Sequence, residues 1–220
     1  MTIASGYFRF WKRLIALLLA PILFAGRLSA SAPTSLGITV QVYNRASVPP
    51  QILIAAEDEA ARIFREAGIT VSWLTCSSSV QKAEINPTCI EPCPPSRFAV
   101  RIISEIPSNL AKTSVGVALS ENGTYATIYY PRIDANAKQG VATHSQILGG
   151  AVAHEIGHLL LGPAPHARFG IMRGDWTAED LQSIAMGAFL FSPQQSALIR
   201  LVALQRMDCD CHLATGARLK

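Results

Sequence analysis

Hydrophobic and polar residues of this chain follow two periods, one typical of β-strands and one typical of α-helices. Short alternating or continuously apolar runs predict five strands, at residues 38–43, 69–73, 98–103, 115–120 and 125–130. Between the first two strands, Pro49 and Pro50 open a segment whose apolar residues recur at helical spacing, and Gly68 stands where a helix C-cap belongs. A strand, a helix and a strand in such close order predict a right-handed crossover between parallel strands.

The last two predicted strands are expected to pair in the opposite sense. Asn122-Gly123 lies between them and is a strong signal for a hairpin turn. A short hairpin makes its two strands antiparallel. One of these strands can therefore form an edge of the sheet.

Three helical segments are predicted in the second half of the chain. The first runs from near Thr143 to Leu161 and stops at Gly162-Pro163. The second begins after Thr177, which resembles an N-cap, and the third restarts after Ser192-Pro193. No linker separates these segments. The sequence thus predicts an α+β fold, with a mixed twisted sheet, a crossover helix and a small helical C-terminal subdomain.

The first 32 residues are typical of an export signal. Lys12-Arg13 ends a positively charged region, the 13 residues 14–26 are apolar, and small residues follow, so cleavage is expected after Ala32 or after Ala30. An uncleaved membrane anchor is the alternative, but 13 apolar residues are short for a bilayer that needs about 20. We therefore expect a secreted or periplasmic protein that keeps no stable membrane anchor after signal cleavage.

The charge of the chain is concentrated in this leader. The chain carries 19 Lys and Arg against 15 Asp and Glu. The excess of basic groups equals the four in the leader, which are Arg9, Lys12, Arg13 and Arg27. The remaining chain is formally neutral, so a basic surface for nucleic acid is not indicated.

All five cysteines lie beyond the leader, where export permits disulfides. They are Cys76, Cys89, Cys93, Cys209 and Cys211. The segment from Cys76 to Cys93 is rich in Pro and Ser, as expected of a loop held by a disulfide. The odd count leaves one thiol over, and the pairing cannot be deduced. The tail Cys209–His212 can alternatively hold a metal, but we favour disulfides for the upstream cysteines.

The residues most informative about chemistry are His154-Glu155-Ile156-Gly157-His158, an H-E-x-x-H motif inside the predicted helix. Residues i and i+4 lie on one helical face, so His154 and His158 can ligate one Zn²⁺. Glu155 is then held beside the open coordination position, where it can take a proton from water at the metal.

Two imidazoles and a water leave one protein ligand to be found. His166 is the nearest candidate, because Gly162 lets the chain turn sharply after the helix. Asp175 and Glu179 are the alternatives, since a carboxylate from a following helix completes some zinc sites.

Together with Gly162, His166 and the segment Gly170-Ile171-Met172-Arg173, this motif resembles the metzincin zinc peptidases. The short run from the third histidine to the methionine is most similar to the matrixin branch, and the order of predicted elements also resembles the clan. The clan pattern is H-E-x-x-H-x-x-G-x-x-H. In this chain three residues precede Gly162 and three more precede His166, so the spacing is two residues longer.

The resemblance implies roles for further residues. Met172 matches the methionine that lies in a tight turn beneath the zinc in this clan. The strand that pairs with an extended peptide substrate would be represented by Val115, Gly116, Val117 and Ala118. After the leader, a single peptidase domain would span residues 33–220. Its sheet and helices would occupy 33–162, and the third ligand, methionine turn and C-terminal helices would occupy 163–220.

We therefore expect a secreted zinc endopeptidase that acts on peptides or proteins through water activated by Glu155. A zinc-stabilised binding module without turnover is one alternative, although a structural site has four protein ligands and no need for Glu155. A zinc amidohydrolase that acts on a non-peptide amide is the other. The sequence does not give the substrate, the cleavage preference or the oligomeric state.

Overall fold

The computed structural model describes residues 36–76, 89, 95–108, 110–111, 113–119, 123–162 and 166–214, with side chains to residue 210. These residues belong to one compact unit, Ser35–Lys220. The predicted leader and its cleavage sites lie outside the described residues, as does Asn122 of the predicted hairpin turn.

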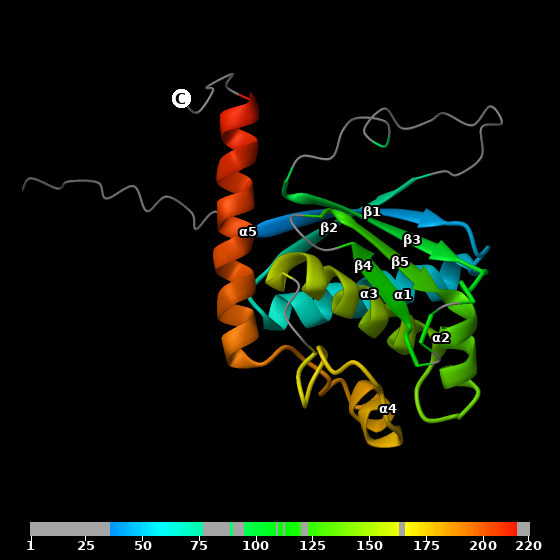
Figure 1. Ribbon diagram of the computed structural model, residues 1–220. Coiled ribbons are helices and arrows are strands. Elements are labelled where there is room, and N and C mark those ends of the chain that lie inside the picture. Colours follow the sequence, from blue (N-terminus) through cyan, green and yellow to red (C-terminus); the bar gives the residue numbers. More distant parts are fainter. Residues whose placement is uncertain are drawn as a thin grey trace, which may run out of the picture. The chain divides into compact units, whose positions relative to one another are not determined.

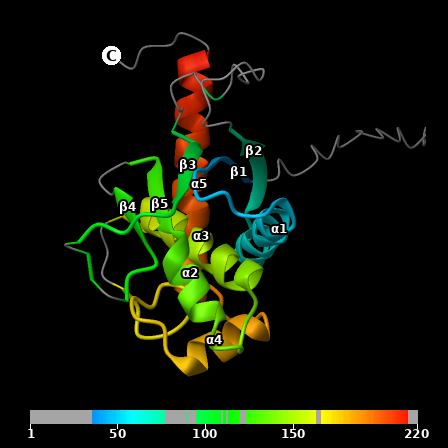
Figure 2. The ribbon, with the colours of Figure 1, turned by 90° about the vertical axis from the view of Figure 1, so that its right-hand side faces the viewer.

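A five-stranded sheet in the order β2-β1-β3-β5-β4 forms the frame of the domain (Figures 1 and 2). Its strands are β1 (Gly37–Asn44), β2 (Thr70–Thr75), β3 (Arg97–Ile103), β4 (Gly116–Leu119) and β5 (Tyr125–Tyr129). β1 pairs in parallel with both β2 and β3, and β3 pairs in parallel with β5. β4 runs antiparallel to β5 and is the last strand at its side of the sheet. The predicted mixed sheet with an antiparallel edge strand is confirmed.

Helix α1 (Pro50–Glu66) connects β1 to β2 as the predicted crossover. Gly68 has a positive φ of 82° and follows the helix end. The amide of Gly68 donates to the carbonyl of Arg65, and the amide of Ile69 donates to that of Phe64. This pattern satisfies the last carbonyls of a helix and requires a residue that tolerates the left-handed region, as Gly68 does.

The end of β5 differs from the prediction. The strand stops at Tyr129, and Tyr130 begins a helix, α2 (Tyr130–Ala137), that the sequence analysis did not predict. Pro131 occupies the first turn of α2, where its missing amide proton costs nothing and its fixed φ favours the helix. The proline was the local signal for this helix start.

Helix α3 (His144–Leu161) lies at the centre of the domain and carries the H-E-x-x-H motif. Thr143 and Gln146 form a capping box at its start, and Gly162 follows its last residue with a φ of 81°. Every residue from Ile147 to Gly157 is buried, because α3 packs against α1 on one side and beneath the sheet on the other. His154 and Glu155 of the motif are therefore buried, whereas His158 is partly exposed.

The predicted C-terminal helices are α4 (Ala178–Ala185) and α5 (Pro193–Ala214). Capping boxes begin both, formed by Thr177 with Asp180 and by Ser192 with Gln195. α5 buries Ile199 and Ala203, whereas Leu198, Leu201 and Leu204 are about half exposed.

One side chain of α5 fastens the end of the motif helix. Arg206 donates to the carbonyl of Leu159 over 2.8 Å and to that of Pro95 over 3.0 Å. A cation near the last turn of a helix satisfies its orphan carbonyls and complements its dipole. The C-terminal helix therefore stabilises α3 close to its histidines.

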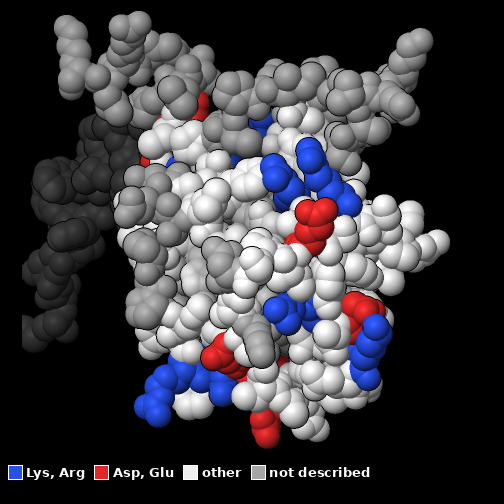
Figure 3. All heavy atoms as spheres, turned by 45° about the vertical axis from the view of Figure 1, so that its right-hand side comes forward, with Lys and Arg blue, Asp and Glu red and all other residues white. Residues whose placement is uncertain are grey.

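A disulfide joins Cys76 to Cys89, as favoured for the upstream cysteines. Cys209 is an exposed free thiol, whereas Cys93 and the side chain of Cys211 lie outside the described residues. Basic and acidic side chains lie side by side on the face seen in Figure 3. Among the described residues, no helix combines the length and apolar character needed to cross a bilayer.

Candidate metal centre

The helix α3 places His154 and His158 one turn apart on the same face. Their Nε2 atoms are 3.1 Å apart, and their ring centroids are separated by 4.7 Å. Two nitrogens that bind one zinc ion at tetrahedral angles, each at 2.0–2.1 Å, lie about 3.3 Å from each other. The two rings are therefore held close to the spacing that a shared metal ion requires.

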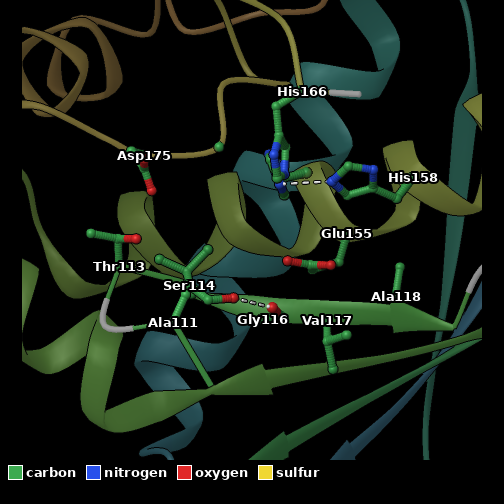
Figure 4. A pocket seen from close by; sticks show the side chains of 13 residues that line it. Ala111, Thr113, Ser114, Gly116, Val117, Ala118, Glu155, His158, His166 and Asp175 are labelled. Carbon is green, nitrogen blue, oxygen red and sulfur yellow. Dashed lines mark hydrogen bonds between the residues drawn. The ribbon is translucent and has the colours of Figure 1, made fainter. Parts of the chain in front are cut away.

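His166 joins this pair from the segment after the helix. Its ring centroid lies 5.3 Å from that of His154 and 4.9 Å from that of His158. One ligand atom from each of the three residues lies within 4.8 Å of the others. Three histidines that come from a helix and a following loop thus form a group that can bind a metal ion (Figure 4).

The two carboxylates considered as alternative ligands lie elsewhere. Neither Asp175 nor Glu179 belongs to the group of metal-binding side chains found among the described residues. Asp175 lines the cleft beside the histidines, whereas Glu179 lines a different pocket on α4.

Backbone hydrogen bonds hold the segment after α3 in a loop that returns toward the helix. The amide of Ala167 donates to the carbonyl of Met172 over 2.8 Å, so His166 begins a tight loop that closes at the methionine. The amide of Ile171 donates to the carbonyl of Leu190, and Gly170 adopts a φ of 75°. These bonds fix the third histidine although the spacing to it is two residues longer than in the clan pattern.

The same loop sets the tautomer of His154. Its Nδ1 lies 2.6 Å from the carbonyl oxygen of Ile171. A carbonyl only accepts, so Nδ1 carries the proton and donates it, which leaves the Nε2 lone pair free for a metal. The ring of Trp176 lies edge-on to His154 with centroids 6.1 Å apart, and its Nε1 donates to the carbonyl of Arg173. His154 is thus oriented from two sides.

Met172 packs against the histidine helix at Gly157. Its side chain is buried, and its Sδ would come within 2.6 Å of a Cβ added at Gly157. Gly157 is one of the two variable positions of the H-E-x-x-H motif. Its lack of a side chain lets the methionine and Phe191 pack directly against the helix backbone.

Glu155 faces the sheet edge next to the histidines (Figure 4). A Cβ at Gly116 of β4 would lie only 2.7 Å from Glu155 Oε1. The absence of a side chain at Gly116 therefore makes the space in which this carboxylate lies. Val115, Gly116, Val117 and Ala118 line the same cleft as Glu155 and the three histidines, and the cleft has a volume of about 340 Å³.

Burial dominates the electrostatics of the site. Desolvation lowers the pKa of His154 to about 4, against the opposing effect of its bond to the Ile171 carbonyl. Desolvation, and then the proximity of His166, lowers the pKa of His158 to about 4. Both imidazoles are therefore neutral near pH 7, the form that binds metals. Burial raises the pKa of Glu155 to about 8 in the metal-free protein.

The donor set suits zinc. Three imidazole ligands would leave one of four tetrahedral positions for water or substrate, which distinguishes a catalytic zinc site from a closed structural one. Glu155 lines the same cleft and is not one of the three clustered side chains.

The sequence places Gly116 in the expected substrate-binding strand, but it does not indicate that glycines make room for the site. Gly116, Gly157 and Gly174 each lie against a side chain of the predicted site, at contacts that no sequence motif describes. The loop residues Ala111 and Thr113 also line the cleft and carry no pattern that separates them from an ordinary loop.

Gly174 provides a test of how His166 is held. A Cβ at this position would lie 2.5 Å from Nδ1 and 2.7 Å from Cγ of His166. We expect Gly174→Ala to displace this ring and to weaken zinc binding about 10- to 100-fold, the usual effect of losing a residue that orients a ligand. Competition with a chromophoric chelator measures the affinity.

Gly150→Ala is the matched control, because its Cβ would meet Trp176 at an ordinary 3.4 Å. This variant should bind zinc like the wild type. Equal zinc affinities for Gly174→Ala and Gly150→Ala would show that the contact with Gly174 does not position His166.

The pKa of Glu155 predicts how the metal-free protein responds to pH. Between pH 6.5 and 8 the unfolded chain has lost the Glu155 proton, whereas the folded chain keeps it. The folded state then binds more protons, so this group makes stability fall as pH rises. His154 and His158 act in the opposite direction until pH is about one unit above their unfolded value of 6.5, and this contribution is the same in the wild type and in Glu155→Gln.

We expect the Tm of the metal-free protein to fall from pH 6.5 to pH 8 more steeply in the wild type than in Glu155→Gln. Thermal unfolding in the presence of a chelator measures both. Parallel curves for the two proteins would contradict a buried, protonated Glu155.

Known proteins resemble this chain in structure but not in sequence. No family model matches the chain, and no curated protein matches its sequence. The structure is similar to that of a zinc-dependent peptidase from Methanocorpusculum labreanum, with a TM-score of 0.51 and 14% identity over 73% of this chain and 99% of that one. An archaemetzincin from Methanopyrus kandleri gives a TM-score of 0.49 and 13% identity, over 79% of this chain and 98% of that one. This chain thus has a fold found in a zinc-dependent peptidase, with a three-histidine group that can bind a metal ion at its centre.

Proposed function

We propose that this protein is a zinc metallopeptidase that cleaves internal peptide bonds. The observation that carries the proposal is the position of Glu155, which lies beside three convergent imidazoles and against the edge strand of the sheet. His154, His158 and His166 are the ligands in this proposal, and the matrixin-like character suggested by the sequence remains part of it.

A zinc ion bound by these histidines supplies a Lewis acid that polarises the scissile carbonyl and acidifies water. Glu155 accepts the proton of the attacking water and passes it to the leaving amine. Its burial suits this task, because a raised pKa increases the affinity of the carboxylate for a proton. A bound zinc ion would lower this pKa again and so favour the ionised form that acts as a base. The Ile171 carbonyl keeps His154 in the tautomer that binds metal.

The edge strand β4 supports a peptide as the substrate. Val115 accepts a hydrogen bond from the amide of Tyr129, so odd-numbered residues of β4 direct their backbone groups toward β5. The alternation of an antiparallel pair then turns the backbone groups of Gly116 and Ala118 away from β5. An extended peptide can pair with such groups.

The cleft also extends to both sides of the catalytic carboxylate. It is lined by Ala118 in one direction along β4 and by Thr113 and Ala111 in the other. A substrate that lies along this wall has chain on both sides of the reacting bond, which favours cleavage of internal bonds. The hydroxyl of Ser114 donates to the outward carbonyl of Gly116 over 2.6 Å and so already satisfies one backbone group of the edge.

The alternative of a binding module is not favoured by this geometry. A structural zinc site has four protein ligands, but the metal-binding group among the described residues has three. A buried carboxylate that does not ligate the metal is costly for stability, so its presence is explained by its chemistry.

Substitution of the carboxylate tests the proposal. Glu155→Gln should bind zinc as the wild type does and lower kcat on internally quenched peptides by about 10²- to 10⁴-fold, the usual contribution of a general base. Metal analysis and peptide hydrolysis are measured on the same samples. Chelation of the wild type should abolish hydrolysis, and added Zn²⁺ should restore it.

His166→Ala and Glu179→Gln complete this series. His166→Ala should lose both zinc affinity and activity, whereas Glu179→Gln, on the exposed surface of α4, should change neither. Undiminished turnover by Glu155→Gln would exclude Glu155 as the general base. A wild type that holds zinc and cleaves no peptide in a library would refute the peptidase.

We also propose that the protein is exported. The sequence of residues 1–32 supports this, and a disulfide between Cys76 and Cys89 is suited to an oxidising compartment. Expression of the full chain in a bacterial host should yield a periplasmic or secreted form whose first residue is Pro33 or Ser31. N-terminal sequencing measures this, and a protein that stays in the cytoplasm with an intact first segment would contradict export.

A further inference from the structure

Two walls enclose the cleft in front of the histidines. One wall is β4 with the loop before it, and the other is the segment Gly174-Asp175 that follows the methionine turn. Figure 4 shows the carboxylate of Asp175 projecting into the cleft, on the side of the histidines that faces away from His158 and above Thr113. Asp175 is exposed, so its carboxylate is accessible to a ligand.

The lining of the cleft has an uneven charge. Among its described lining residues, the acidic side chains are Glu155 and Asp175, and Lys and Arg are absent. The described lining residues of the wall formed by β4 and the loop before it are small and uncharged. Because Glu155 is engaged by the proposed chemistry, Asp175 is the acidic group that remains available to bind a substrate side chain.

No structural role accounts for Asp175. It makes no hydrogen bond or ion pair to the described residues and is not part of the metal-binding group. The cap of α4 is formed by Thr177 and Asp180 instead. The nearby Arg173 pairs with Asp180 over 3.4 Å, so its positive charge is directed toward a different carboxylate.

The chemistry of the site favours an organic cation over a metal ion as the partner of Asp175. A single carboxylate beside small neutral residues provides one charged ligand, whereas divalent cations in proteins need several oxygen ligands. The ammonium group of a lysine or the guanidinium group of an arginine needs one carboxylate.

We propose that Asp175 selects substrates with a lysine or arginine side chain close to the scissile bond. This inference rests on the proposed peptidase function. The basic side chain of a peptide that lies along β4 would extend across the cleft to the opposite wall and pair with the Asp175 carboxylate. Because Asp175 does not contact the reacting bond, the pairing strengthens binding of the substrate rather than the chemical step.

A matched set of peptides tests the inference. Internally quenched peptides carry lysine, arginine, norleucine or glutamate at one position at a time, within three residues of the cleaved bond. For the zinc-loaded wild type we expect kcat/KM to be about three- to tenfold higher with lysine or arginine than with norleucine at one of these positions. The difference should lie in KM and should shrink at high salt.

Variants at Asp175 assign the preference to this carboxylate. Asp175→Asn should remove the preference, so that kcat/KM becomes equal for lysine and norleucine peptides, and Asp175→Lys should reverse it in favour of glutamate. Glu179→Gln is the control, since it removes an exposed acidic group outside the cleft and should keep the preference. Lys112 lies outside the described residues, so the Asp175→Asn comparison is repeated in a Lys112→Ala background, where the same loss is expected.

Binding to the zinc-loaded Glu155→Gln protein separates this inference from the proposed function. Fluorescence anisotropy should give about three- to tenfold tighter binding of the lysine peptide than of its norleucine counterpart, and this difference should vanish when Asp175→Asn is added. Such binding without any hydrolysis by the wild type would refute the peptidase and retain the role of Asp175. Equal affinities and equal kcat/KM for basic and neutral peptides, or a preference that survives Asp175→Asn, would overturn the inference.

Discussion

The site depends on backbone segments that approach one another more closely than side chains would allow. Gly157 admits Met172 beneath the motif helix, Gly174 gives the ring of His166 its position, and Gly116 gives the carboxylate of Glu155 its position. At each contact an added Cβ would lie 2.5–2.7 Å from the neighbouring atom. Interiors pack at the density of organic crystals, so a methyl group at such a contact moves the neighbouring side chain. The arrangement of ligands and carboxylate is therefore set by packing as much as by helical spacing.

One hydrogen bond joins the two halves of the site. The carbonyl of Ile171 accepts from His154 Nδ1, and Ile171 is itself fixed by its amide bond to Leu190. This chain of contacts links the motif helix, the methionine turn and the segment that leads to α5. Partners of this kind hold a ligand in one tautomer and one orientation, which lowers the cost of ordering it when a metal binds. The segment between α4 and α5 thus contributes to the site through Leu190, which is not one of the three clustered histidines.

The longer loop to His166 is accommodated by local geometry. α3 continues to Leu161, and Gly162 then turns the chain with a positive φ. The bond between the Ala167 amide and the Met172 carbonyl draws the following residues back under the helix. The position of a loop ligand depends on where its loop is anchored, and the number of residues in the loop can vary around that anchor.

The sequence alone determined the elements and the local chemistry. Alternation marked the strands, capping residues such as Thr143 and Thr177 marked the helix starts, and the i, i+4 spacing placed His154 and His158 on one face, because these signals are local along the chain. The pattern did not predict α2, because the apolar run of β5 continues directly into Tyr130 and Pro131 at the helix start. Tertiary structure alone decided that His166 rather than Asp175 or Glu179 joins the histidine pair, that Glu155 lies against Gly116, and that Asp175 faces the cleft. Those relations join residues far apart in the sequence through packing, and no local pattern records which segments will meet.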